Sequence, residues 1–238
     1  MKEYIDKFVK LLTKWNIQID DHKLDLFERY YDLLISWNER INLTAITDKE
    51  DVYIKHFADS LAVLKTDDLS GQKMIDVGSG AGFPGIPIGI MCPDTDCLLI
   101  DSLNKRTLFL EEVIERLDLH NVRVMHGRAE DLARNDDLRE NFDLAVSRAV
   151  ADLSVLSEYC LPFVNINGTF ISYKSGIVDD ELAGAGKAID ILGGHVRKVE
   201  RFDIPFTDYE RSLIYIDKDR HTDQKYPRKA GKPLKKPL

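Results

Sequence analysis

Apolar side chains recur at helical spacing near the amino terminus. One stripe, with members three or four residues apart, is formed by Leu24, Phe27, Tyr31 and Leu34, the spacing of one face of an amphipathic helix. A second stripe lies beside it and consists of Leu26, Tyr30, Leu33 and Trp37. A helix with two apolar faces packs on two sides, so we predict that this segment lies between other elements.

The start of the next helix is predicted from a capping sequence. Residues 42–46 interrupt the apolar periodicity, and Thr47 and Glu50 then fit the S/T-x-x-E capping box that begins a helix. This helix should continue to about Lys65. We therefore expect residues 1–66 to form a helical cap.

From residue 73 onward the pattern changes to short apolar runs separated by amphipathic segments. Strands are predicted at residues 73–77, 97–101, 122–126, 142–147, 168–174, 195–204 and 211–217, and the clearest helices at 104–117, 153–160 and 179–192. Strands that alternate with helices form a parallel sheet with right-handed crossovers. The last two strands are joined by a short segment without helical pattern, so they should form an antiparallel hairpin.

Composition narrows the class of protein. A hydrophobic content of 44% in 238 residues allows one large α/β domain with a sizeable core. No apolar run reaches the roughly 18 residues of a membrane helix, and the charged amino terminus lacks the apolar region of a signal peptide, so we expect a cytoplasmic protein. The three cysteines form no C-x-x-C pair and the six histidines no H-E-x-x-H motif, which disfavours a metal site.

Charge is distributed unevenly along the chain. The net charge of −8 argues against a protein that coats nucleic acid over its whole surface. Residues 221–238 nevertheless carry six Lys and Arg against a single acid, Asp223. A basic tail on an acidic body indicates an anionic partner at one place, although such a tail can also serve only to keep the chain soluble.

A glycine-rich loop follows the first predicted strand. Gly78, Gly80 and Gly82 lie where a glycine backbone can approach a ligand at the carboxyl end of that strand. Two cofactor classes use such a loop, because residues 80–85 also match the dinucleotide fingerprint G-x-G-x-x-G. Three features favour S-adenosylmethionine: Asp76 inside the strand, Gly78 directly after it, and Phe83 in place of the third fingerprint glycine.

The chemistry of S-adenosylmethionine assigns roles to residues that follow the strands. Asp101 would accept both ribose hydroxyls, because a carboxylate offers two oxygens and no donor. Asp76 would support the loop or the cationic amino-acid end of the cofactor, and Ala129 and Glu130 stand where the adenine should lie. Glu130 can equally be a solvated carboxylate at a helix start. Arg148 ends the fourth strand and should face the reacting groups.

These features together predict an α/β fold. We expect a Rossmann-like, seven-stranded class I methyltransferase sheet that is mostly parallel, with a C-terminal antiparallel hairpin and an N-terminal helical cap. The methyltransferase domain should span residues 67–220 and the basic tail residues 221–238, within a single structural unit.

Six segments, in chain order, resemble the RsmG (GidB) family. They are Asn42-Leu-Thr-Ala-Ile, His56-x-x-Asp-Ser-Leu61, Asp76-Val-Gly-Ser-Gly-Ala-Gly-Phe-Pro-Gly85, Asp101-Ser-Leu-Asn-Lys-Arg106, Ser147-Arg-Ala149 and Lys225-Tyr-Pro-Arg-Lys-Ala-Gly-Lys-Pro233. The resemblance implies methylation of N7 of one guanine in bacterial small-subunit (16S) ribosomal RNA, with S-adenosylmethionine as the donor. It also implies cofactor contacts from Gly78, Phe83, Ala129, Glu130 and Arg148. Asn104 stands where the family usually has Gly, and Asn also tolerates left-handed conformations.

The implied reaction needs little chemistry from the protein. Guanine N7 carries an in-plane lone pair and no proton at neutral pH, so its attack on the sulfonium methyl needs no general base. Catalysis would consist of in-line positioning, without a metal or a covalent intermediate, and Arg148 would orient the guanine or the cofactor carboxylate.

The RNA should present its guanine outside a regular helix. Side chains cannot enter the groove of A-form RNA that displays N7, so the target should lie in a loop or be extruded. His56 and Asp59 would border the base, although they can equally be an ordinary helix-surface pair or serve only in helix-cap packing. The side chains expected on phosphates are Lys105, Arg106, Lys225, Arg228, Lys229 and Lys232.

Two other functions stay open on the sequence alone. The shifted fingerprint would suit a nicotinamide-dependent oxidoreductase, and a methyltransferase-like fold can also bind its ligand without turnover. The expected partner is 16S ribosomal RNA or the small ribosomal subunit. No feature of the sequence demands a dimer, so we expect a monomer.

Overall fold

Seven strands form one sheet in the computed structural model, which describes residues 2–148 and 151–238. Their order across the sheet is β3-β2-β1-β4-β5-β7-β6. The strands are β1 (Lys73–Val77), β2 (Asp96–Asp101), β3 (Val122–His126), β4 (Phe142–Arg148), β5 (Val164–Ser175), β6 (Gly194–Asp203) and β7 (Glu210–Lys218). Strand β7 runs antiparallel to both of its neighbours, and the other pairs are parallel. The predicted fold class, with its C-terminal hairpin, is confirmed. Ala149 of the Ser-Arg-Ala segment lies outside the described residues.

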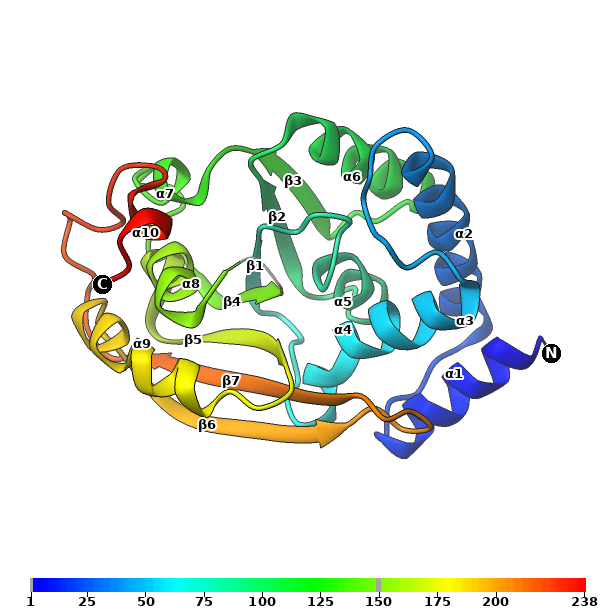
Figure 1. Ribbon diagram of the computed structural model, residues 1–238. Coiled ribbons are helices and arrows are strands. Elements are labelled where there is room, and N and C mark those ends of the chain that lie inside the picture. The colour runs from blue at the N-terminus through cyan, green and yellow to red at the C-terminus, as the bar shows by residue number, and fades with distance from the viewer. Residues whose placement is uncertain (1, 149–150) are drawn as a thin grey trace.

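Helices cover both faces of this sheet (Figure 1). One face packs against α5 (Gly85–Met91), α6 (Asn104–Leu117) and the N-terminal helices, and the other against α7 (Ala129–Leu132), α8 (Leu153–Cys160) and α9 (Asp179–Ile191). A hydrophobic core lies on each face of the sheet. Successive side chains of a strand point to opposite faces, so Met74 packs into the core beside α5 and α6 and Ile75 into the core beside α8 and α9. Among the described helices, none is long and apolar enough to span a membrane.

The predicted boundaries differ most in β5. The strand begins at Val164, earlier than the predicted residue 168. The intervening Asn165-Ile-Asn-Gly168 has the composition of a turn, and Asn167 does adopt a positive φ of 70°. The chain nevertheless continues through an irregularity in the pairing with β4, between Phe142 and Leu144. A β-bulge allows a strand to continue through residues that favour a turn. Hydrophobic periodicity alone does not reveal such a bulge.

The N-terminal cap consists of α1 (Glu3–Lys14), α2 (Asp21–Asn38) and one continuous helical run that ends at Lys65. That run passes through α3 (Lys49–Val52), the π-helical turn η1 (Tyr53–Ala58), α4 (Asp59–Leu61) and the 3₁₀ turn η2 (Ala62–Lys65). The predicted cap residue was wrong, because Asp48 and not Thr47 caps the run: the Asp48 carboxylate accepts from Asp51 N at 3.0 Å. Asp is the better N-cap of the two.

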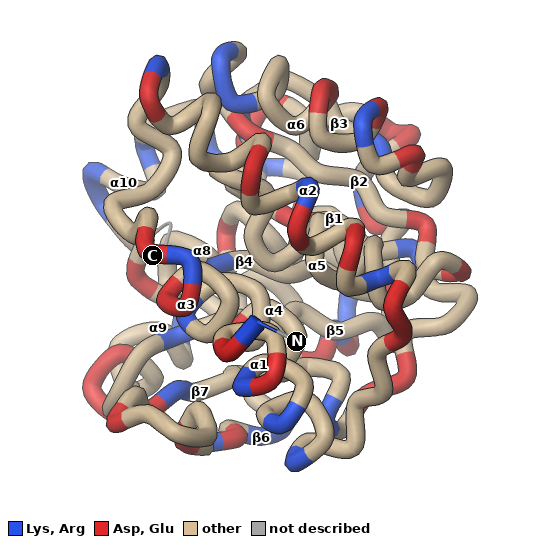
Figure 2. Tube along the Cα trace, turned by 90° about the vertical axis from the view of Figure 1, so that its right-hand side faces the viewer, with Lys and Arg blue, Asp and Glu red and all other residues tan. Residues whose placement is uncertain are grey.

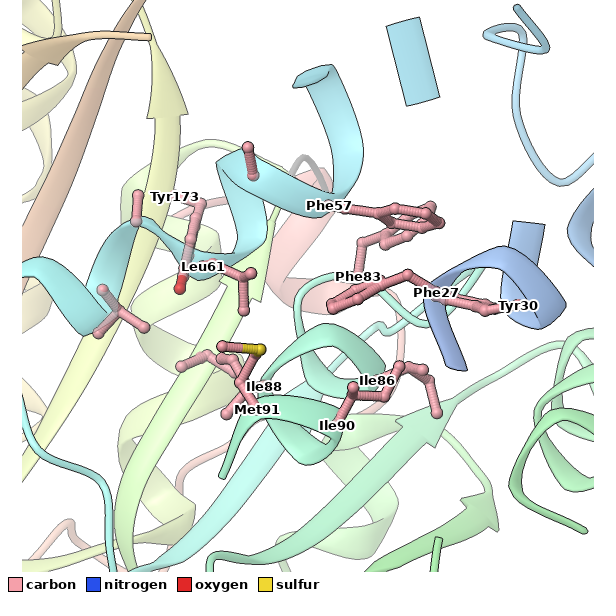
Figure 3. Close-up of a cluster of buried hydrophobic side chains, with 14 of the residues drawn as sticks. Phe27, Tyr30, Phe57, Leu61, Phe83, Ile86, Ile88, Ile90, Met91 and Tyr173 are labelled. Atoms are coloured by element: carbon pink, nitrogen blue, oxygen red, sulfur yellow. The ribbon is translucent and has the colours of Figure 1, made fainter. Parts of the chain in front are cut away.

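An aromatic cluster joins the cap to the glycine loop. The Phe83 ring lies 5.7 Å from Tyr30 of α2 and 6.1 Å from Phe57 of η1, measured between centroids. Figure 3 shows these rings together with Phe27. The fully buried Tyr30 hydroxyl donates to the carbonyl of Ala81 within the loop. Cap and sheet therefore share one hydrophobic core, and the division of the chain at residue 66 stays a prediction.

This packing predicts that substitution by alanine destabilises the protein to different extents at two glycines of the loop. Both Gly80 (φ +60°) and Gly82 (φ +93°) adopt positive φ, which costs an L-residue about 1–2 kcal/mol. A Cβ at Gly82 would also lie 2.7 Å from both the Tyr30 hydroxyl and Ile86, whereas one at Gly80 meets nothing closer than 3.9 Å. Overpacking adds about 1–3 kcal/mol. Urea unfolding should therefore show a larger loss for Gly82→Ala than for Gly80→Ala, and equal losses would contradict this packing.

Candidate active site

Three hollows adjoin one another at the carboxyl ends of the parallel strands. The tail hollow, about 180 Å³, is lined by Val77, Gly78, Ile100, Asp101, Ala129, Glu130, Tyr159 and Leu234, among others. The loop hollow, about 450 Å³, is lined by Thr44, His56, the glycine loop, Phe83, Asp101, Arg106 and Arg148. The hairpin hollow, about 730 Å³, is lined by Lys55, His56, Asp59, Arg148, Lys174, Tyr209 and Arg211, among others. Gly78 and Asp101 belong to the first two hollows, and His56 and Arg148 to the last two.

Asp101 lies where the tail hollow meets the loop hollow. One of its carboxylate oxygens accepts from Gly80 N at 2.9 Å and the other from Leu103 N at 2.8 Å. Arg106 approaches the first oxygen at 3.4 Å. A carboxylate offers about four lone-pair sites, so Asp101 keeps acceptor capacity while it fixes the loop.

Asp76, within β1, supports the backbone that follows the glycine loop, which is one of the two roles expected for it. Its carboxylate is fully buried, and one oxygen accepts from Gly85 N at 2.9 Å. Burial raises the pKa of this carboxyl to about 7, against the opposing effect of the Gly85 hydrogen bond. Asp76 lines none of the three hollows, so its contact is with the loop, and a direct contact with the cofactor stays a prediction.

Arg148 is held from several sides at the end of β4. Its guanidinium donates to the Asp59 carboxylate at 2.8 Å and to the His56 carbonyl at 3.4 Å. It also faces Nδ1 of His56 at 3.3 Å and lies over the Phe83 ring, 4.8 Å from the centroid. These contacts fix the group in the wall between the loop hollow and the hairpin hollow.

His56 is a neutral hydrogen-bonding residue in this arrangement. Burial, followed by the nearby Arg148 charge, lowers its pKa to about 3. Nδ1 therefore accepts from Arg148, which leaves the proton on Nε2, 2.8 Å from the Thr44 hydroxyl. The ring stacks on Phe83 with centroids 4.5 Å apart. An imidazole in this setting does not gain a proton near neutral pH.

Asp59 is also committed to Arg211. Its second oxygen accepts from Arg211 Nε at 3.1 Å, and the residue is only 5% exposed. Asp59 is therefore not an exposed helix-surface residue; its burial fits helix-cap packing, and its place beside the base stays a prediction. Tyr209, at 38% exposure, stands beside Arg211 with 5.5 Å between its ring centroid and the guanidinium carbon. Lys55 lies 4.9 Å from the same ring.

The basic tail is folded against the domain. Arg228 donates to the buried carboxylate of Glu158 through its guanidinium, at 2.6–3.1 Å, and through its backbone N–H at 2.7 Å. This ion pair corrects the expectation that Arg228 holds a phosphate. Arg106 lies 3.4 Å from Asp101 and lines the loop hollow, with its side chain 34% exposed, so its contact with a phosphate stays a prediction. The exposed cations expected on RNA are Lys105, Lys225, Lys229 and Lys232.

Several residues of the hollows were not singled out from the sequence, among them Arg211, Tyr159 and Leu234. Arg211 could have been found, because the predicted antiparallel hairpin brings the start of β7 to the edge where the parallel strands end, and Arg211 does pair with Ser175. Tyr159, on α8, and Leu234, near the C-terminus, gave no local signal. Within residues 2–148 and 151–238, no group of three or more His, Cys, Asp or Glu is placed to hold a metal ion.

Solved structures share the fold at low sequence identity. A SAM dependent methyltransferase from Aquifex aeolicus superposes with a TM-score of 0.53 at 18% identity, over 71% of this chain and 93% of that chain. The precorrin-6y C5,15-methyltransferase of Geobacter metallireducens superposes with a TM-score of 0.52 at 16% identity, over 75% of this chain and 92% of that chain.

Curated proteins are similar over nearly the whole chain. A protein of Lachnoclostridium phytofermentans named ribosomal RNA small subunit methyltransferase G is 52% identical, over 97% of this chain and 96% of its own. One of the same name from Clostridium perfringens is 47% identical, over 99% of both chains. The profile of the GidB family, described as rRNA small subunit methyltransferase G, matches residues 23–213. The resemblance found in the sequence is thereby confirmed, and the chain belongs to the GidB family.

Proposed function

We propose that this protein transfers the methyl group of S-adenosylmethionine to N7 of a guanine in bacterial 16S ribosomal RNA. The transfer is an in-line displacement without a general base, carried out by a cytoplasmic monomer. Relatives named ribosomal RNA small subunit methyltransferase G support the reaction class and the kind of RNA. They also favour this function over a nicotinamide-dependent oxidoreductase.

The loop hollow and the tail hollow fit the cofactor. Asp101 has acceptor capacity for the ribose hydroxyls, and Ile100 and Ala129 give the neighbouring hollow apolar walls suited to a purine. Gly78 and Gly80 leave the backbone free of side chains beside the loop hollow. When bound, the cofactor supplies an electrophilic methyl group on a sulfonium. The fold also supports this assignment, since a neighbour with a TM-score of 0.51, TYW2 of M. jannaschii, is titled as a complex with AdoMet.

The observation that carries the proposal is the position of Arg148. Its side chain belongs to the wall that the loop hollow shares with the hairpin hollow. A methyl donor on one side and a guanine on the other would meet beside this guanidinium. Arg148 can therefore orient the cofactor carboxylate or the guanine, and no step requires it to lose a proton.

The hairpin hollow suits an unstacked guanosine. RNA bases outside a helix stack on aromatic rings and guanidinium planes, and Tyr209 and Arg211 offer both. Exposed lysines hold phosphates in this proposal, namely Lys105, Lys225, Lys229 and Lys232. On the side of the molecule shown in Figure 2, basic and acidic positions are interspersed, which suits docking at one place more than broad coating of RNA.

The groups around Arg148 support catalysis by positioning. His56 is held neutral with its pKa near 3, and it accepts from Arg148 through Nδ1. Asp59 is engaged by two guanidinium groups. Holding N7, the methyl carbon and sulfur in line can supply roughly 7–11 kcal/mol of the barrier.

Transfer of a labelled methyl group tests the function directly. Small ribosomal subunits and deproteinised 16S RNA, both from cells lacking this enzyme, would be incubated with the protein and tritiated S-adenosylmethionine. The label should appear in 16S RNA as 7-methylguanosine, located by borohydride reduction and aniline cleavage. Label on another atom of guanine, or on another base, would refute the N7 assignment, and no transfer to either substrate would refute the activity.

Arg148 should be needed for methyl transfer, and a lysine should replace it poorly. Arg148→Ala removes a charge-assisted contact worth about 1.5–3 kcal/mol, so kcat/KM should fall roughly 10- to 100-fold. Arg148→Lys should recover only part of this loss, because a point charge cannot reproduce the planar fork. Arg123→Ala, which breaks an exposed ion pair with Asp96, is the matched control. An Arg148→Ala enzyme as active as this control would contradict the assigned role.

A further inference from the structure

The C-terminal segment, residues 222–238, is tied to the domain by three glutamates. Glu140 accepts from Thr222 N at 2.7 Å and Glu158 from Arg228 N at 2.7 Å. Glu130, the residue expected beside the adenine, accepts from Gly231 N at 2.8 Å. Figure 1 shows the segment lying beside α7 and α8.

The strongest of these ties is the Glu158–Arg228 ion pair. The Glu158 side chain is 1% exposed, and both of its oxygens accept from the Arg228 guanidinium. A buried carboxylate is costly without its partner, so the pair holds the segment in one place. Arg139 reinforces it by donating to the carbonyls of Thr222 and Tyr226, at 2.7 Å and 2.9 Å.

The ties bring one apolar side chain into the tail hollow. Leu234, in the short helix α10 (Lys232–Lys235), lines this hollow together with Gly78, Ala129 and Glu130. It is 64% exposed, although it comes from a segment fixed three residues earlier at Gly231. A large apolar side chain exposed to water is ordinary by itself. Here it faces a hollow whose other walls include Val77 and Ile100.

We propose that Leu234 binds the cofactor by covering the adenine ring, which makes the C-terminal segment a wall of the cofactor site. The inference rests on the proposed function. An aromatic purine gains most when apolar groups cover its surface from water, and Leu234 closes a hollow whose other walls come from β1, β2, α7, α8 and the segments that connect strands to helices. Glu130 acts in this arrangement as a positioning residue, since its carboxylate holds the backbone three residues before Leu234.

Calorimetric titration with S-adenosylhomocysteine tests this wall in the full chain. Because the adenine would cover part of the apolar surface of Leu234, Leu234→Ser should raise the Kd of S-adenosylhomocysteine about 5- to 10-fold. A chain ending at Gly231 keeps the Glu130 contact and should lose a similar factor. The control is Ile177→Ser, which removes an apolar side chain that is 82% exposed and lines none of the three hollows. Its Kd should equal that of the unchanged protein.

Two outcomes separate this inference from the proposed function. If the unchanged protein binds S-adenosylhomocysteine and both Leu234→Ser and the shortened chain bind it equally well, the adenine wall is refuted and the methyltransferase activity stands. If the unchanged protein fails to bind the compound, the proposed function itself fails. Thermal unfolding of Leu234→Ser without ligand should match that of the parent, because Leu234 is mostly in water. The shortened chain also loses the buried Pro233 and the packing of Leu238, so it should unfold at a lower temperature. A fall in unfolding temperature for Leu234→Ser itself would assign Leu234 a structural role instead.

Discussion

The Asp59 carboxylate holds together the parts of the active site. It accepts from Arg148 of β4 through one oxygen and from Arg211 of β7 through the other, while its own backbone belongs to the cap. A buried carboxylate between two guanidinium groups is stable only while its partners stay in place. The wall between the loop hollow and the hairpin hollow therefore depends on the docking of the cap.

The same docking fixes the glycine loop. Phe83 leaves the loop to join the aromatic rings of the cap, and the Tyr30 hydroxyl binds the loop backbone at Ala81. Cap, loop and sheet consequently belong to one core. The N-terminal helical segment therefore supports both the glycine loop and the wall that Arg148 forms between the loop hollow and the hairpin hollow.

Local sequence patterns predicted the strands and helices well, but they predicted the contacts of the C-terminal tail poorly. Alternating and helical periodicities located the seven strands, and the register of the glycines against β1 indicated the loop. The sequence also pointed to Arg148 at the end of β4. Which partner a charged residue meets depends on distant segments, however: Arg228 looks like any cation of a basic tail until Glu158, 70 residues earlier, is seen to bind it. The place of Leu234 depends on the same long-range contacts.

In the proposed mechanism, Arg148 and its partners position the reactants and no side chain removes a proton. The most direct test is the rate of a single methyl-transfer turnover between about pH 6 and pH 8. The cofactor and the RNA should both be at saturating concentration. The measured rate then does not depend on any change in cofactor affinity that follows the titration of Asp76, whose pKa is about 7. With His56 neutral throughout, the rate should change less than about threefold. A rate that rises about tenfold per pH unit would show an essential general base and contradict the account.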